Sequence, residues 1–177
     1  MPGTGCSDTP EPAPPPSFLP EFPATARGCD NDGFLRTSIY GAFETAVDWR
    51  SDGLDCEGMP RPDGEGARLR FAGSVSDGTQ KLTFIIAMPD LVPGQPAREL
   101  ATNVTLIAEG SGRFFSTPGL DSCWTDVDMR ESGGQSPDAF AVEGTLYCIA
   151  PIPEVNGTSS ISLEETHFSG RLDWSAK

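Results

Sequence analysis

Side chains suited to acid–base or nucleophilic chemistry are scarce in this chain, apart from carboxylates. The sequence has one histidine, His167, and no GxSxG, HExxH or glycine-rich phosphate-binding motif. On a strand, His167 alternates with the apolar Phe168 and shares an outward face with Ser169 and Asp173. Residues two apart on a strand are neighbours by default, so a Ser–His–Asp grouping there carries little meaning. We therefore expect an exposed histidine and a protein without catalytic activity.

Carboxylates are abundant, with 26 acidic against 12 basic residues. Glycoside hydrolysis needs two acids at a defined separation beside a sugar cleft, and the sequence does not rank Glu143, Glu164 and Glu165 for that role. Ca²⁺ also prefers such oxygen ligands. Asp30 and Asp32, in the segment CDNDG, suggest a calcium-binding turn that lacks the full DxDxDG spacing. A solvated turn is the alternative, and no other cofactor is expected.

Three aromatic residues, Tyr40, Trp124 and Tyr147, are candidates for stacking on a sugar. Strand alternation places Trp124 on the same face as Asp126 and Asp128, away from the apolar residues of that segment. A tryptophan beside carboxylates is typical of carbohydrate binding, so we predict a ligand-binding set of Trp124, Asp126 and Asp128. The alternative is a tryptophan packed beneath a neighbouring loop.

Four of the five cysteines form two pairs that are close in the sequence. We predict the disulfides Cys29–Cys56 and Cys123–Cys148, each stabilising by roughly 3–4 kcal/mol on the chain-entropy model. Other connectivities, or four reduced cysteines in a cytosolic protein, are the alternatives. The cysteines include no CxxC pair, so a zinc site is not expected.

The fifth cysteine, Cys6, lies between a short polar start and a proline-rich segment. It follows Thr4-Gly5 and precedes Pro10, Pro12, Pro14, Pro15, Pro16, Pro20 and Pro23. In these features the chain resembles a mature bacterial envelope lipoprotein, in which a small residue precedes a diacylated cysteine and a stalk follows. The resemblance implies lipidation of Cys6 and an extracytoplasmic location in the bacterial cell envelope, either periplasmic or anchored in the outer membrane.

The resemblance is confined to the N-terminal segment, and Met1–Gly5 lacks the apolar stretch and leucine usually found upstream. We expect the chain to begin just before a processing site. A linker remnant, or a cysteine that pairs with another chain, is the alternative. Residues 1–28 are predicted to be a disordered, polyproline-like tether, and residues 29–177 a single folded domain.

The net charge of −14 at pH 7 limits the partners that the protein can have. Such a field repels phosphate backbones, so we expect no nucleic-acid binding. Direct docking on anionic lipid is disfavoured as well, which leaves the lipid anchor as the expected membrane contact. An acidic surface usually serves solubility; a surface for cationic partners is the alternative.

From residue 34 onward, apolar and polar residues alternate with a period of two, as in β-strands. The clearest predicted hairpin joins residues 69–75 to 82–88 through a Ser-Asp-Gly-Thr turn. Ile85 and Ala87 predict that its second strand is central and covered on both faces. Residues 53–66, with two prolines, predict a long loop. About eight or nine strands indicate a single antiparallel β-sandwich, jelly-roll or immunoglobulin-like.

These features predict a membrane-tethered, extracytoplasmic β-sandwich that binds an envelope polymer, carbohydrate or protein ligand without catalysis. Two alternatives come from other classes of protein. One is an accessory subunit of an envelope or secretion assembly, in which an edge strand pairs with a partner. The other is a carbohydrate-active enzyme. The sequence gives no indication of the oligomeric state.

Overall fold

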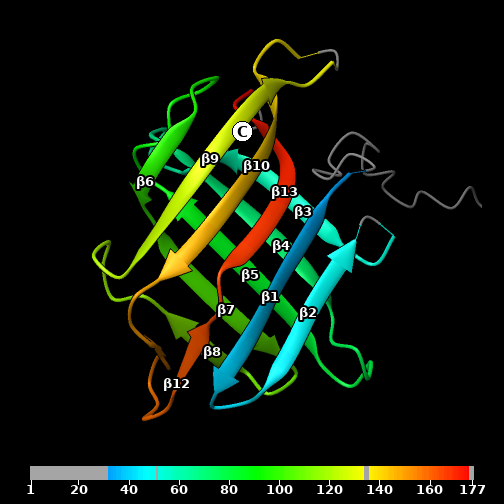
Figure 1. Cartoon of the computed structure of the whole chain (residues 1–177), viewed down its shortest axis with the longest axis vertical. Helices are drawn as coiled ribbons and strands as arrows, with labels where there is room; N and C mark the ends of the chain where they lie inside the picture. The colour runs from blue at the N-terminus through cyan, green and yellow to red at the C-terminus, as the bar shows by residue number, and fades with distance from the viewer. Residues whose placement is uncertain (1–31, 51, 134–135, 176–177) are drawn as a thin grey trace, which may run out of the picture.

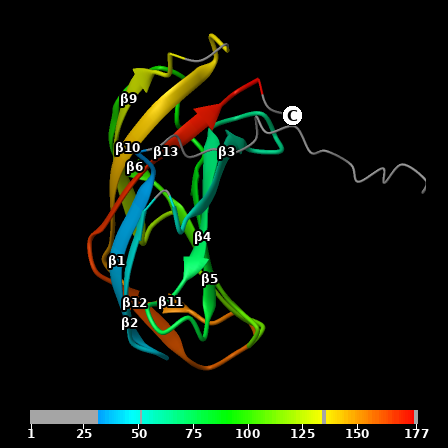
Figure 2. The ribbon, with the colours of Figure 1, turned by 90° about the vertical axis from the view of Figure 1, so that its right-hand side faces the viewer.

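The structure is a computed structural model of the chain that describes residues 32–50, 52–133 and 136–175. These residues form thirteen strands in two packed antiparallel sheets, which confirms the predicted all-β sandwich (Figures 1 and 2). The strands outnumber the predicted eight or nine in part because Ile152–Pro153 is too short to show alternation and because Asp55–Pro60 lies in a segment predicted to be a loop.

One sheet, called the large sheet below, has eight strands. These are β1 (Phe34–Gly41), β2 (Thr45–Arg50), β6 (Ala97–Ala101), β9 (Cys123–Glu131), β10 (Ala139–Cys148), β11 (Ile152–Pro153), β12 (Ser160–Leu163) and β13 (Thr166–Asp173). Their order is β11–β12–β1–β13–β10–β9–β6. β13 and β12 pair with successive parts of one side of β1, and β2 pairs with its opposite side. Figure 1 shows β2 and β6 at opposite margins of this sheet.

The other sheet, called the small sheet, has five strands. In spatial order they are β3 (Asp55–Pro60), β4 (Ala67–Ser74), β5 (Lys81–Met88), β7 (Asn103–Glu109) and β8 (Arg113–Ser116). The predicted hairpin is β4–β5, with Phe71 opposite Phe84. β5 is central, as predicted, but its outward residues Ile85 and Ala87 remain partly exposed, so the prediction of cover on both faces is wrong.

The prediction of a loop over residues 53–66 is also wrong, because β3 lies within it. β3 pairs with β4 from Asp55 opposite Ala72 to Pro60 opposite Ala67. At Gly58 the two sheets come so close that an added Cβ would collide with the Arg171 backbone of β13. Glycine is required there, and its low strand propensity is what concealed the strand.

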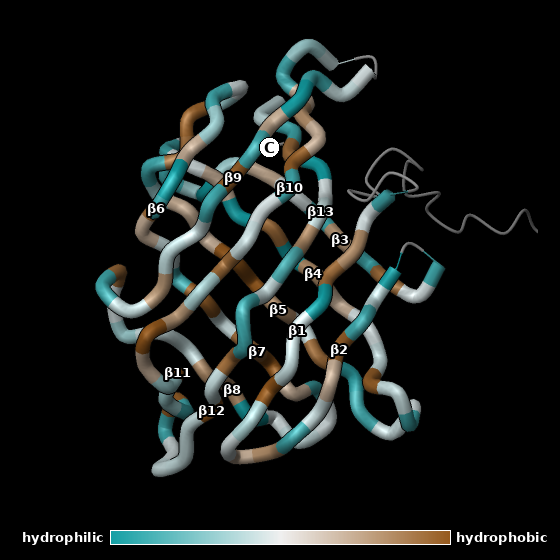
Figure 3. Tube along the Cα trace, viewed as in Figure 1, coloured by the Kyte–Doolittle hydropathy of each residue, from teal (hydrophilic) through white to brown (hydrophobic). Residues whose placement is uncertain are grey.

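The core lies between the two sheets and follows the alternation of each strand. Figure 3 shows apolar and polar residues alternating along the strands, with inward residues such as Leu35, Phe84 and Val127 buried. Phe71 of the small sheet meets Phe168 of the large sheet with ring centroids 5.7 Å apart. Trp49 of β2 closes another part of the interface.

The predicted Cys123–Cys148 disulfide is present and links directly opposite residues of β9 and β10. Cys56 is also disulfide-bonded. Its predicted partner Cys29 lies outside the described residues, as do Cys6, Asp30 and the predicted tether over residues 1–28. In the part of the chain that the structure describes, no helix has the length and apolar character needed to cross a membrane.

Candidate functional site

The outward face of the large sheet carries two transverse rows of mostly polar side chains. Each row crosses five strands, in the order β2, β1, β13, β10 and β9. The first row is Asp48, Arg36, His167, Thr145 and Asp126; the second is Arg50, Phe34, Ser169, Glu143 and Asp128. The antiparallel register alone sets these rows, because directly opposite residues share a face.

A hollow of about 350 Å³ lies between these rows. It is lined by Phe34, Arg36, Asp126, Asp128, Glu143, Gly144, Thr145 and His167. Three of these side chains are carboxylates, against one guanidinium and one imidazole. The hollow therefore offers mainly hydrogen-bond acceptors and has no preference for anions.

An aromatic pair flanks this hollow. Trp124 of β9 and Tyr147 of β10 are directly opposite each other, and their rings stack with centroids 6.2 Å apart and planes 26° apart. Both rings are half-buried. Burial, followed by the carboxylates of Asp126 and Glu99, raises the pKa of the Tyr147 phenol, which therefore stays protonated and able to donate a hydrogen bond.

The structure places Trp124, Asp126 and Asp128 on one outward face, as predicted, but the two carboxylates already have partners. Asp126 Oδ1 accepts the backbone N–H of Glu99 at 2.8 Å, and Asp128 Oδ1 accepts a hydrogen bond from Arg98 Nη2 at 2.7 Å. Arg98 and Glu99 form a bulge in β6, where Glu99 has a φ of +50°. These carboxylates thus hold the edge strand β6 while they line the hollow.

His167 faces outward, as expected, with 45% of its side chain exposed. Its Nδ1 lies 3.2 Å from Thr145 Oγ1, and its Nε2 lies 3.1 Å from Oε1 of Glu165. Asp173 instead accepts hydrogen bonds from Ser175. The partners of His167 are therefore Thr145 and Glu165, and not the serine and aspartate of a Ser–His–Asp grouping.

The candidate acids are separated by their surroundings. Glu143 lines the hollow opposite Asp128, whereas Glu164 accepts a hydrogen bond from the Tyr40 hydroxyl at 2.9 Å, and Glu165 pairs with His167. Tyr40 thus lies apart from the Trp124–Tyr147 pair.

Of the two aspartates in the predicted calcium turn, only Asp32 is described, and it is exposed. Over the described ranges, no group of three or more His, Cys, Asp or Glu side chains is arranged to hold a metal ion. Calcium binding by Asp30 and Asp32 stays a prediction of the sequence.

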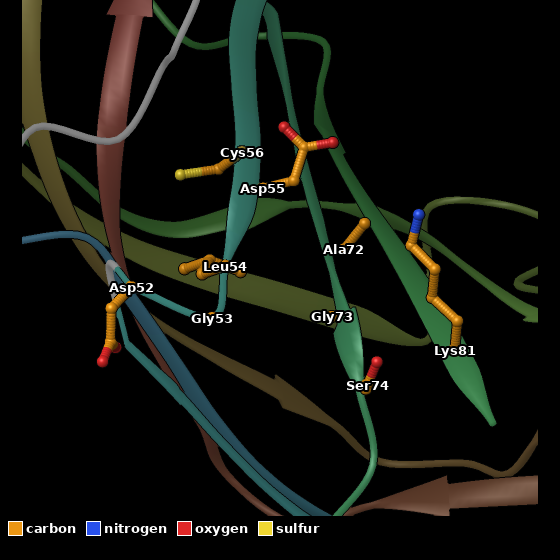
Figure 4. A pocket seen from close by; sticks show the side chains of 9 residues that line it. All are labelled: Asp52, Gly53, Leu54, Asp55, Cys56, Ala72, Gly73, Ser74 and Lys81. Atoms are coloured by element: carbon orange, nitrogen blue, oxygen red, sulfur yellow. The ribbon is translucent and has the colours of Figure 1, made fainter. Parts of the chain in front are cut away.

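A larger hollow, of about 500 Å³, lies where β2 leads into β3 (Figure 4). Asp52 and Lys81 stand at opposite sides of it, with Cys56 and Gly73 among its lining residues. Lys81 Nζ lies 3.7 Å from Glu109, and Asp55 is 3.0 Å from Arg70, so its described charges are largely paired. No aromatic ring lines it among the described residues, which makes it a weaker candidate than the outward face.

Arg36 and Thr145 of the hollow were not predicted. Glu143, His167 and Tyr147 were considered singly, as an acid, an outward histidine and a stacking ring, but were not assigned to the ligand-binding set. A signal for three of them was available in the predicted disulfide. If Cys123 is opposite Cys148 on antiparallel strands, Tyr147 must be opposite Trp124, Thr145 opposite Asp126, and Glu143 opposite Asp128. The contribution of β1 and β13 depended on strand order, which the sequence did not indicate.

The fold and this face together describe an acidic, disulfide-linked β-sandwich with a polar and aromatic outward surface. Comparison with protein families, with curated proteins and with solved structures found no match to this chain.

Proposed function

We propose that the protein is a non-enzymatic, extracytoplasmic binding module that takes a neutral carbohydrate on the outward face of the large sheet. The observation that carries the proposal is the Trp124–Tyr147 pair beside a hollow lined by Asp126, Glu143 and Thr145. A sugar presents an apolar face that stacks on aromatic rings and hydroxyls that donate to carboxylates.

Charge supports a neutral ligand. The chain has a net charge of −14, and the hollow contains more carboxylates than cationic groups. An anionic polymer would be repelled both at long range and at the site. The site also lies on paired strands held by a disulfide, so little conformational entropy would be lost on binding.

An extracytoplasmic location is supported by the Cys123–Cys148 disulfide, because such bonds persist in oxidising compartments. Attachment through a lipid on Cys6, with residues 1–28 as a spacer, completes the proposal. A lipid-anchored module would hold a glycan near the envelope without a contact between the acidic domain and the membrane.

The test is isothermal titration calorimetry of the purified chain against neutral cello-, xylo-, malto- and chito-oligosaccharides. We expect saturable binding to at least one series and none to polyuronates of equal length. Binding of polyuronates alone, or of none of these glycans, would contradict the proposal.

A carbohydrate-active enzyme is the second candidate, favoured by Glu143 and Asp128 at directly opposite positions beside the hollow. Opposite residues bring two carboxyl groups close enough for acid catalysis with a nucleophile. The ion pair of Asp128 with Arg98 opposes this role. Incubation with the bound oligosaccharide decides between the candidates, because release of reducing ends would show hydrolysis and its absence would favour a binding module.

A further inference from the structure

The edge of the large sheet formed by β2 lacks the backbone devices that normally prevent further strand pairing. An edge strand presents unpaired N–H and C=O groups, and proteins block such edges with prolines, bulges, short strands or covering segments, and also with charged side chains. The charged residues of β2, Asp48 and Arg50, are of opposite sign and so do not present a single repelling charge. β2 has neither proline nor glycine, and it pairs with β1 without a bulge from Thr45 opposite Ile39 to Arg50 opposite Phe34.

Every other edge strand in the described structure carries such a device. β11 has two residues and ends in Pro153, and β6 contains the bulge at Glu99. β8 is covered by the segment after β11, where Val155 N donates to Phe114 O at 2.7 Å. β3 ends in Pro60 and lies against the β13 backbone at Gly58.

The side chains of β2 would also allow another strand to be added to the sheet beside it. Thr45, Val47 and Trp49 point toward the core, whereas Ala46, Asp48 and Arg50 are exposed on the outward face. Figure 1 shows β2 at the margin of the large sheet, and within the described ranges no strand lies beyond it.

We infer that β2 pairs antiparallel with β2 of a second copy of this chain, about a two-fold axis through Val47. A continuous sheet requires opposite residues to share a face, so the axis must pass through a residue and not between two residues. Such a pairing is isologous and closes after two copies.

The charges of this segment select the register. With the axis at Val47, Glu44 lies opposite Arg50 of the second copy, twice per dimer, and Ala46 lies opposite Asp48. An axis at Ala46 would instead place Glu44 opposite Asp48, and an axis at Asp48 would place two aspartates opposite each other. An axis at Trp49 would place Asp48 opposite Arg50, but it would join only residues 48–50 of the two strands. Opposite charges on facing residues stabilise a strand pair and like charges destabilise it, so the Val47 register is the one that combines complementary charges with pairing along most of β2.

We expect the dimer to be weak and to dissociate on dilution, because a pair of short strands buries less surface than a standard protein–protein interface. Two chains of net charge −14 also repel each other, so the measurement belongs at about 0.15 M salt, where screening acts beyond about 8 Å. The inference depends on the edge geometry and is independent of the proposed ligand.

The experiment is sedimentation equilibrium of the full chain from about 10 μM to about 1 mM, the range in which weak dimers dissociate. Non-reducing gel electrophoresis identifies any disulfide-linked species. We expect a monomer–dimer equilibrium that Glu44→Lys or Arg50→Glu each weakens by about tenfold, since each change introduces two repulsive contacts. The double variant E44K/R50E restores the affinity. Arg130→Glu, the same charge change on exposed β9 surface, leaves it unchanged.

Hydrogen–deuterium exchange locates the interface. We expect residues 45–50 to gain protection as the concentration rises, whereas β6 at the opposite margin does not. A monomer at all concentrations, a dimer insensitive to both single reversals, or single-variant losses that the double variant does not repair would each overturn the inference. Circular dichroism confirms that each variant is folded.

Discussion

Arg113 of β8 holds Glu154 with two hydrogen bonds, Nε to Oε1 at 2.8 Å and Nη2 to Oε2 at 3.0 Å. Ser159 donates to the same carboxylate, and the guanidinium lies 5.1 Å from the centroid of the Phe115 ring. Glu154 follows β11, so this contact ties the edge of the small sheet to the end of the large sheet. Only 15% of the Glu154 side chain is exposed, which is less than for the carboxylate of any other ion pair in the described structure.

Glu154 should make the stability depend on pH in the acid range. The hydrogen bond from Arg113, followed by that from Ser159, lowers the pKa of Glu154 from 4.5 to about 2. Because the folded pKa is the lower one, the carboxylate contributes fully above the unfolded pKa and loses its contribution as the pH falls toward 2. We expect Glu154→Gln to lower the Tm by about 2–4 °C at pH 6, and this difference to shrink to a small fraction of that value by pH 2.

The matched control is Arg61→Gln, which removes an ion pair between neighbours in an exposed turn, Arg61 Nη2 to Asp63 Oδ2 at 2.9 Å. Exposed pairs of this kind contribute little, so its Tm should stay near that of the wild type. A Glu154→Gln effect that is constant from pH 6 to pH 2 would show that the carboxylate charge is not responsible.

The Cys123–Cys148 disulfide should contribute to the stability of the β9–β10 pair. It closes a loop with a sequence separation of 25 residues, and replacing both cysteines by alanine should lower the free energy of unfolding by about 3 kcal/mol. Urea unfolding without reductant measures this loss, and peptide mapping should recover the linked peptides. Cys6→Ser should leave the free energy of unfolding unchanged. Free thiols at positions 123 and 148 would contradict the pairing.

Trp49 requires a glycine across the sandwich. Its indole N–H donates to the Ser74 carbonyl at 2.8 Å, and a Cβ added to Gly73 would lie 2.6 Å from Trp49 Cε2. Because the added methyl group would collide with a buried ring that is held by this hydrogen bond, we expect Gly73→Ala to cost about 1–3 kcal/mol. Gly53→Ala, at an exposed position with nothing within 4 Å of the added methyl group, is the control. Equal unfolding curves for the two variants would refute the steric explanation.

Local pattern determined most of what the sequence predicted correctly. Alternation placed Trp124, Asp126 and Asp128 outward because a strand periodicity of two is independent of the strand's neighbours. Cysteine spacing identified the Cys123–Cys148 pair. Strand alternation depends only on residues close in the sequence, and disulfide pairing is indicated by cysteine alone.

Long-range contacts determined the rest. β3 resembled a loop because Gly58 and Pro60 suit its contact with β13 and its position at an edge. Arg98 and Glu99 of β6 bind the β9 carboxylates through a bulge in which Glu99 has a positive φ. A positive φ at a non-glycine residue has no clear sequence signal. Arg113 and Glu154 meet across 41 residues of chain, and the rows of the outward face exist only once β13 lies between β1 and β10.

The most direct test of the proposed binding face is calorimetric titration of Trp124→Ala with the neutral oligosaccharide that binds the wild-type chain. Trp124 supplies the larger ring of the aromatic pair, so we expect its removal to raise the Kd at least about tenfold, with the fold unchanged by circular dichroism. Phe114→Ala is the matched control, because Phe114 is an exposed aromatic residue of the small sheet, with 45% of its surface accessible, and should leave the Kd unchanged. Equal affinities for the wild type and a folded Trp124→Ala variant would show that the glycan binds elsewhere.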